Sequence, residues 1–304
     1  MTTPQVFWTV VSFLFGSVFG SFLNVCIYRL PLGKSLIWPP SHCPRCFQPV
    51  GTWNIPIVSW FILGGKCRRC GQRFSIRYSL IELLTAAIFA WFFYLFVVEQ
   101  GAPLGVYFAY LVLAMVLIVA SFVDLDCRII PDKVTAFGGV LAIVFAASFP
   151  GLLRIYLGNQ SPGIPGVDEV TKFISDYPRL DAVFASLAGM VAGVVLIVVI
   201  RFIGTAVFRR EAMGLGDAKL MAVIGGFLGW KAIPLVFMFA AVIGTVIGLI
   251  TYFKTREHQL PLGPFLALGC VIVLVWGNGL VDWWVRHLMG LDIRVDMVTR
   301  FGGG

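Results

Sequence analysis

The stretch LGVYFAYLVLAMVLIVASFV, residues 104–123, decides the class of fold. It runs for twenty residues without a charged side chain, and an α-helix needs about 20 apolar residues to cross the hydrocarbon core of a bilayer. Inside that core each backbone N–H and C=O must find its partner within the protein, which a helix achieves by itself. We therefore expect a transmembrane helix over these residues.

The composition of the whole chain extends this expectation to an all-α polytopic membrane protein. Of the 304 residues, 59% are hydrophobic and only 12% are charged, whereas soluble domains carry about 25% charged residues. This excludes a soluble globular domain, and the abundance of aromatic and aliphatic residues excludes a disordered chain. We expect about eight transmembrane helices, or seven if the sixth apolar run, which is short and rich in Gly, does not cross the membrane by itself. They are Val6–Tyr28, Leu80–Val98, Leu104–Val123, Val134–Phe149, Val183–Phe208, Leu220–Trp230, Ala232–Phe253 and Leu260–Val285.

The distribution of basic residues predicts the orientation of the chain. Residues 29–79 hold eight Lys and Arg side chains and no acidic one, which by the positive-inside rule places this loop in the cytoplasm and the N-terminus outside. No basic residue precedes the first apolar run, so we expect it to be retained rather than removed as a signal peptide. Topology thus explains much of the +8 net charge, and we expect no nucleic-acid partner.

The cytoplasmic loop contains two pairs of cysteines, CPRC (43–46) and CRRC (67–70), with 20 residues between the pairs. This spacing is typical of a four-thiolate zinc site, in which two tight turns close a tetrahedral shell around the ion. A redox-active dithiol pair and unmetallated thiols are the alternatives, and the reducing cytosol disfavours a disulfide. The predicted Zn²⁺ ligands are Cys43, Cys46, Cys67 and Cys70. Because they leave no position open for water, we expect a structural site.

Acidic residues gather at the ends of two apolar runs. Asp124 directly follows residues 104–123, and Asp217 follows the glycines of GLGD (214–217). Ionisable groups at such positions are functional candidates, because burying a charge near the hydrocarbon is costly. Asp126 and Asp132 lie farther from the hydrocarbon, and we interpret them as solvated acids paired with basic neighbours. Their candidate partners are Arg128, Lys133 and Lys219.

If Asp124 and Asp217 meet at one membrane face, they form the pair of an aspartic peptidase. Two close carboxylates share one proton; the ionised partner activates water and the protonated one polarises the scissile carbonyl. Asp217 begins a predicted helix and Asp124 ends one, so the helix dipoles favour Asp217 as the base and Asp124 as the acid. This assignment is a hypothesis that site-resolved carboxyl titration tests, and finding Asp124 ionised while Asp217 is protonated would reject it.

Taken together, the motifs resemble the type IV prepilin peptidases, which are bifunctional leader peptidases and N-methyltransferases. Besides CPRC and CRRC, the motifs are GSVFGSFLNVCIYRLP (16–31), RYSLIELLTA (77–86), DLDCRIIPD (124–132), GLGDAKLMA (214–222) and PLGPFLALG (261–269). The resemblance implies a bacterial inner-membrane enzyme that acts on prepilin or pseudopilin precursors, which are apolar helices preceded by a short basic leader. It implies cleavage of the leader after Gly at the cytoplasmic face, then methylation of the new N-terminus from S-adenosyl-L-methionine.

The resemblance also assigns roles to particular residues. The catalytic pair is Asp124 and Asp217, the tetracysteine loop binds zinc, and Glu82 of RYSLIELLTA is a candidate for the methyltransferase site. We expect four parts: a first transmembrane helix (1–28), a zinc-binding and methyltransferase-associated loop (29–79), a membrane-embedded peptidase domain (80–285) and a C-terminal tail (286–304).

Two other classes of function remain open on the sequence alone. A transporter or proton pathway also uses buried acids and Gly-rich helices, and it would show a repeated half, for which we find no internal similarity. A zinc-stabilised membrane scaffold is the other, and in that case replacing both aspartates by Asn is silent in a pilin-processing assay.

Overall fold

The computed structural model describes residues 2–43, 45–49, 55–152, 177–208, 214–255 and 261–288. In these ranges every regular element is a helix, as the sequence predicts, and the only strand-like features are two isolated β-bridges in the loop that follows the first helix. The chain divides into two compact units, residues 1–107 and 108–304. The connection at 153–176 and most of the predicted tail at 286–304 lie outside the described residues.

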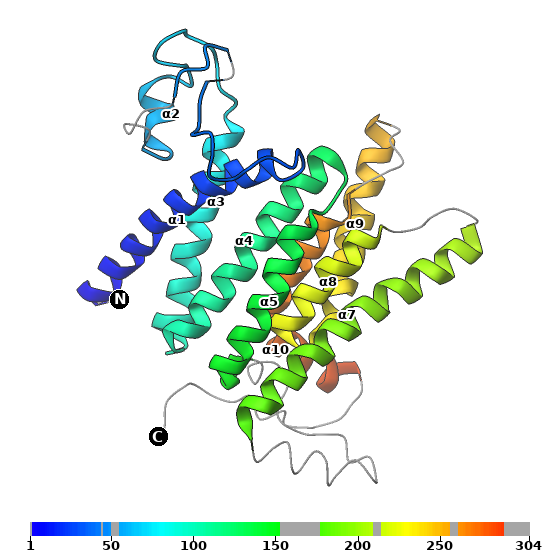
Figure 1. Cartoon of the computed structure of the whole chain (residues 1–304). Helices are drawn as coiled ribbons and strands as arrows, with labels where there is room; N and C mark the ends of the chain where they lie inside the picture. The colour runs from blue at the N-terminus through cyan, green and yellow to red at the C-terminus, as the bar shows by residue number, and fades with distance from the viewer. Residues whose placement is uncertain are drawn as a thin grey trace. The chain divides into compact units, whose positions relative to one another are not determined.

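The first unit is built on two apolar helices that pack closely. α1 (Thr3–Arg29) lies beside α3 (Arg77–Phe92), which continues as the π-helical segment η1 (Phe93–Glu99) (Figure 1). A Cβ on Gly20 of α1 would lie only 2.7 Å from the Cα of Glu82. Such small residues let helix backbones approach in a membrane, where packing rather than the hydrophobic effect drives association.

The loop that follows α1 folds back onto the end of that helix. Arg29, the last residue of α1, is buried, and its guanidinium donates hydrogen bonds to the carbonyls of Ser35 (3.0 Å) and Pro39 (2.6 Å). These contacts tie the start of the loop to the end of α1. The short helix α2 (Val58–Ile62) lies between the two cysteine pairs, and α3 follows the second pair.

The second unit is a helical bundle. α4 (Leu104–Cys127) begins in the first unit and runs into the second. It is followed by α5 (Asp132–Ser148), η2 (Pro150–Leu152), α7 (Pro178–Phe208), α8 (Leu215–Leu228), η3 (Trp230–Ala232), α9 (Ile233–Thr255) and α10 (Gly263–Leu288).

Packing around α8 fixes its position in this bundle. α7 and α8 run side by side (Figure 1). A Cβ on Gly189 would collide with the carbonyl of Gly225, and a Cβ on Gly225 would collide with the carbonyl of Gly189. On another side, a Cβ on Gly138 of α5 would lie 2.9 Å from Val223. Ten of the fourteen residues of α8 are buried, which holds this short helix in the core of the unit.

Five helical segments are long and apolar enough to cross a membrane by length and composition, and a shorter apolar helix covers Gly263–Gly277. These segments are counted among the described residues only. The predicted spans at 134–149 and 220–230 form α5 and α8, which have 17 and 14 residues and fall short of that length. The number of eight spans therefore stays a prediction. The five segments are Thr3–Arg29, Arg77–Glu99, Leu104–Cys127, Pro178–Val207 and Trp230–Thr251.

Candidate functional site

Asp124 lies in the last turn of α4 and is buried, with 6% of its surface exposed. The helix ends just beyond it because Arg128 takes a positive φ of 55°, and the Arg128 N–H closes the final turn on the Asp124 carbonyl at 2.9 Å. Pro131 then precedes the first residue of α5. The sequence DLDCRIIPD thus makes a tight connection between two helices, with Asp124 at its inner side.

Asp217 is the third residue of α8 and is also buried, with 9% exposed. Gly214 caps this helix in an extended conformation, and the next glycine permits a close approach: a Cβ on Gly216 would lie 3.1 Å from the Cβ of Ile130. The GLGD motif therefore places the start of α8 directly against the connection that carries Asp124. The predicted apolar span starts at residue 220, and the helix begins at Leu215, which puts Asp217 in its first turn as expected.

The structure brings the two predicted aspartates together within the second unit. Their carboxylates are close enough for the charges to interact, although 92 residues separate them along the chain. Two buried carboxylates whose charges interact do not both ionise cheaply, so such a pair can share one proton. This is the arrangement that acid–base chemistry on a bound water requires.

A third group completes this site and was missed from the sequence. The backbone N–H of Gly263, the first residue of α10, donates a 2.9 Å hydrogen bond to Oδ2 of Asp124. The helix N-terminus and its N–H favour the ionised form of the acceptor. This contact opposes the influence of the C-terminus of α4 on Asp124. The dipoles of α4 and α8 alone therefore do not decide which aspartate acts as the acid and which as the base. The motif PLGPFLALG was the only sequence signal for it.

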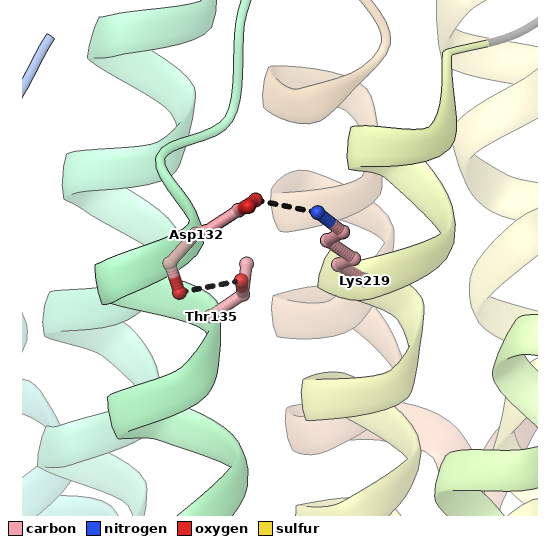
Figure 2. Close-up of polar contacts among 3 residues, drawn as sticks. All are labelled: Asp132, Thr135 and Lys219. Atoms are coloured by element: carbon pink, nitrogen blue, oxygen red, sulfur yellow. Dashed lines mark hydrogen bonds and ion pairs between the residues drawn. The ribbon is translucent and has the colours of Figure 1, made fainter.

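Asp132 is not part of the buried pair. Its Oδ1 lies 2.6 Å from Nζ of Lys219, and its backbone carbonyl accepts a hydrogen bond from the hydroxyl of Thr135 at 3.1 Å (Figure 2). The Asp132 and Lys219 side chains are 75% and 49% exposed. The interpretation of Asp132 as a solvated acid with a basic neighbour is confirmed, and the ion pair links the starts of α5 and α8.

In the first unit, the four predicted zinc ligands converge. The sulfur atoms of the tetracysteine cluster all lie within 4.8 Å of one another, and Sγ of Cys43 is 3.7 Å from Sγ of Cys70. Tetrahedral coordination at Zn–S distances of 2.3 Å puts sulfurs about 3.8 Å apart, so the donor set fits this ion. No disulfide joins the described cysteines. The cluster consists of Cys43, Cys46, Cys67 and Cys70.

The two cysteine turns have the same backbone design. In each, the first cysteine donates its N–H to the carbonyl five residues later, at 3.0 Å for Cys43 and 2.8 Å for Cys67. The residue four positions after that cysteine returns an N–H and takes a positive φ, 55° at Phe47 and 70° at Gly71. Two equivalent turns thus present their sulfurs to one centre, which sequence spacing alone predicted.

Backbone N–H groups within these turns favour the thiolate forms. Hydrogen bonds from the backbone of Cys46 and Arg45 lower the pKa of Cys43 to about 6. Those from Cys70 and Arg69 lower the pKa of Cys67 in the same way. A thiolate is the form that binds a metal ion, so the turns prepare these two side chains as ligands.

Comparison with known proteins agrees with the site. Residues 14–96 match the model described as the Bacterial Peptidase A24 N-terminal domain, and residues 170–249 match that of the Type IV leader peptidase family. A prepilin leader peptidase/N-methyltransferase of Aeromonas salmonicida (strain A449) is 31% identical over 315 residues, which cover 94% of this chain and 96% of the relative. The chain belongs to the type IV leader peptidase family.

Other curated relatives with this name give the same result. The Aeromonas hydrophila protein is 32% identical over 94% of this chain and 96% of its own length, and the Legionella pneumophila protein is 31% identical over 94% and 97%. No solved structure matches the chain. In this family member, the cysteine cluster lies in the first matched segment and Asp217 in the second, while Asp124 and Gly263 lie outside both.

Glu82 of this peptidase family member lies on α3 and is buried, with 7% exposed. Its Oε2 accepts the backbone N–H of Ile57 at 2.7 Å, and Ile57 holds a positive φ of 65° just before α2. Glu82 therefore binds the backbone just before α2, between the two cysteine pairs. A role in binding the methyl donor stays a prediction.

Proposed function

We propose that this chain cleaves the leader of type IV prepilins or type II secretion pseudopilins after Gly, and then N-methylates the new N-terminal residue. The convergence of Asp124 and Asp217, two buried acids from separate helices, carries the peptidase half of this proposal. The names of the relatives, which cover nearly the full chain, support both halves. The proposed setting is the bacterial inner membrane, with the aspartates and the 29–79 loop facing the cytoplasm.

In the proposed reaction, the ionised carboxylate of the pair removes a proton from a water molecule while the protonated carboxyl donates a hydrogen bond to the scissile carbonyl. The water oxygen bonds to the carbonyl carbon and gives a tetrahedral intermediate. A proton then passes to the leaving nitrogen as the C–N bond breaks, so that the products are a leader carboxylate and a new N-terminal amine. The N–H of Gly263 holds the Asp124 carboxylate in place throughout.

The depth of the aspartates suits the precursor. Asp124 lies in the last turn of its helix and Asp217 in the first turn of α8, so both acids lie at helix ends. A precursor whose apolar helix begins just after the leader carries its scissile bond at the edge of the membrane. The bond therefore reaches the acids without extraction of the helix from the bilayer.

For the methyltransferase half we propose S-adenosyl-L-methionine as the methyl donor and Glu82 as a candidate member of its site. The support is its position: Glu82 is buried and accepts a hydrogen bond from Ile57, which lies between the two cysteine pairs. We propose that the four cysteines bind one structural Zn²⁺, which would hold the two turns together. The parts proposed from the sequence, 1–28, 29–79, 80–285 and 286–304, remain the working description of the chain.

One experiment tests both activities. Full-length protein in lipid nanodiscs is incubated with a prepilin and a labelled methyl donor, and cleavage and label transfer are followed separately. Asp124→Asn and Asp217→Asn should each abolish cleavage, whereas Asp132→Asn, a matched change at an exposed acid, should retain it. Cleavage that persists in both aspartate variants would reject the catalytic role of this pair. No cleavage by the parent protein would reject the peptidase and leave the scaffold or transporter class. A cleaved but unlabelled product would reject the methyltransferase half alone.

A further inference from the structure

Ser121 of α4 has a buried hydroxyl that lacks a hydrogen-bond partner. Its side chain is 9% exposed, and among the residues that the structure describes, its Oγ is the only buried side-chain nitrogen or oxygen without a partner. An unpaired buried hydroxyl is a net cost to the folded state. Such an atom calls for an explanation in function when it lies beside a reactive group.

Other serine and threonine hydroxyls in helices of this chain make hydrogen bonds of kinds that Ser121 does not make. A serine or threonine inside a helix commonly donates to a carbonyl of the preceding turn, and six hydroxyls here do so at 2.7 to 2.9 Å. They belong to Thr9, Ser17, Thr85, Ser148, Thr245 and Thr251. Ser186 instead donates across to the carbonyl of Gly226 on α8 at 2.8 Å. Ser121 makes neither kind of hydrogen bond.

Ser121 lies on the face of α4 that carries Asp124. Three residues of an α-helix correspond to about 60° of rotation once the full turn is subtracted. Side chains lean toward the helix N-terminus, so the Asp124 carboxylate leans over the turn that contains Ser121. α4 ends at Cys127, which places Ser121 one turn farther from the helix end than the aspartate.

A peptidase at this depth must satisfy groups that its substrate exposes. The scissile bond lies where the precursor helix begins, so the backbone carbonyls just before that helix have no N–H partner within it. In a site with little water, such a group is costly unless the enzyme supplies a donor. Ser121 is a donor without a partner, one turn inward from the catalytic pair.

We propose that the Ser121 hydroxyl donates a hydrogen bond to a backbone carbonyl of the bound precursor next to the scissile bond. The bond forms on binding, and it aligns the segment around the scissile bond against Asp124 and Asp217. This inference rests on the proposed peptidase function, because it names the group that holds the substrate of that reaction. It makes Ser121 a substrate-binding residue whose loss weakens binding and leaves the acid–base chemistry intact.

The test compares Ser121→Ala with Ser186→Ala in full-length protein in nanodiscs. Both remove a buried serine hydroxyl, but only that of Ser186 has a partner in the protein. Ser186→Ala should lower Tm and leave substrate binding unchanged. Ser121→Ala should leave Tm unchanged or raise it, because an unsatisfied group is removed. It should weaken precursor binding about tenfold, the effect of one lost hydrogen bond, and Ser121→Thr should restore binding.

Two readouts separate this inference from the proposed function. The Kd for an intact precursor, measured in an Asp217→Asn background, needs no cleavage and decides the role of Ser121. The KM of the active enzyme should rise by the same factor with kcat and the pH profile unchanged. A Kd within twofold of the parent, or a Tm loss equal to that of Ser186→Ala, would overturn the inference. Cleavage that survives Asp217→Asn would overturn the catalytic role proposed for the aspartate pair, and the Kd comparison would then use a non-cleavable precursor.

Discussion

Gly263→Ala tests how the N-terminus of α10 holds the Asp124 carboxylate. A Cβ at this position would lie 2.8 Å from Oδ2 of Asp124 and 3.3 Å from its Cβ. Contacts below about 3 Å do not persist, so the carboxylate must move while the alanine keeps its N–H. We expect loss of most of the 2.9 Å hydrogen bond, and a bond to a charged group contributes about 1.5–3 kcal/mol.

That free energy corresponds to a fall of roughly 10- to 150-fold in kcat/KM at about 1.4 kcal/mol per factor of ten. The assay is cleavage of a prepilin by nanodisc-embedded enzyme, with Tm measured in parallel. Gly244→Ala is the matched control: its Cβ would lie 3.2 Å from the ring of Phe265 on α10, which crowds the same helix without touching Asp124.

We expect Gly244→Ala to retain kcat/KM within about threefold. Equal losses in the two variants would show that general crowding of α10 is responsible and would refute the role assigned to Gly263. Full activity in Gly263→Ala would do the same.

Three further predictions concern the cysteine loop and the exposed ion pair. Cys43→Ser should reduce bound zinc from about one ion per chain and speed proteolysis of the loop, as measured by metal analysis and limited digestion; unchanged zinc content contradicts the site. Gly71→Ala, at φ 70° with open space around the new Cβ, should cost about 1 kcal/mol of strain and weaken zinc binding several-fold in chelator competition. Gly33→Ala, at φ 64° outside the turns, should cost similar strain but leave zinc binding unchanged. A double-mutant cycle on Asp132 and Lys219 should give a coupling free energy below about 1 kcal/mol in thermal unfolding. A larger coupling would show that this ion pair stabilises the fold more than its exposure to solvent implies.

The helices could be predicted because the bilayer leaves the backbone almost no alternative. Long apolar runs such as 104–123 fold as helices whatever their neighbours, and α4 follows that run closely. The apolar run at 220–230 begins later than α8, because Gly214 caps the helix and Gly216 makes room for Ile130, so the first turn holds residues that are not apolar. Helix limits depend on tertiary contacts that periodicity does not contain.

The candidate site also has residues that the sequence predicts and contacts that it does not. The cysteine pairs carry their geometry in their spacing, so the four ligands could be named in advance. The aspartates could be named because they end apolar runs, but nothing local predicts that Gly263, 139 residues from Asp124, donates to its carboxylate. Three basic residues were candidate partners of Asp132, and only the packing of α5 against α8 brings Lys219 to it.

The contact between Gly189 and Gly225 leaves no side chain between the backbones of α7 and α8. Gly225 follows Asp217 by eight residues, about 12 Å along a helix axis. Any bulkier residue at either glycine must displace α8, and the rigid helix would carry the aspartate with it. A random screen for inactive variants should therefore recover substitutions deep in the bundle, remote from the scissile bond, that mimic a damaged active site.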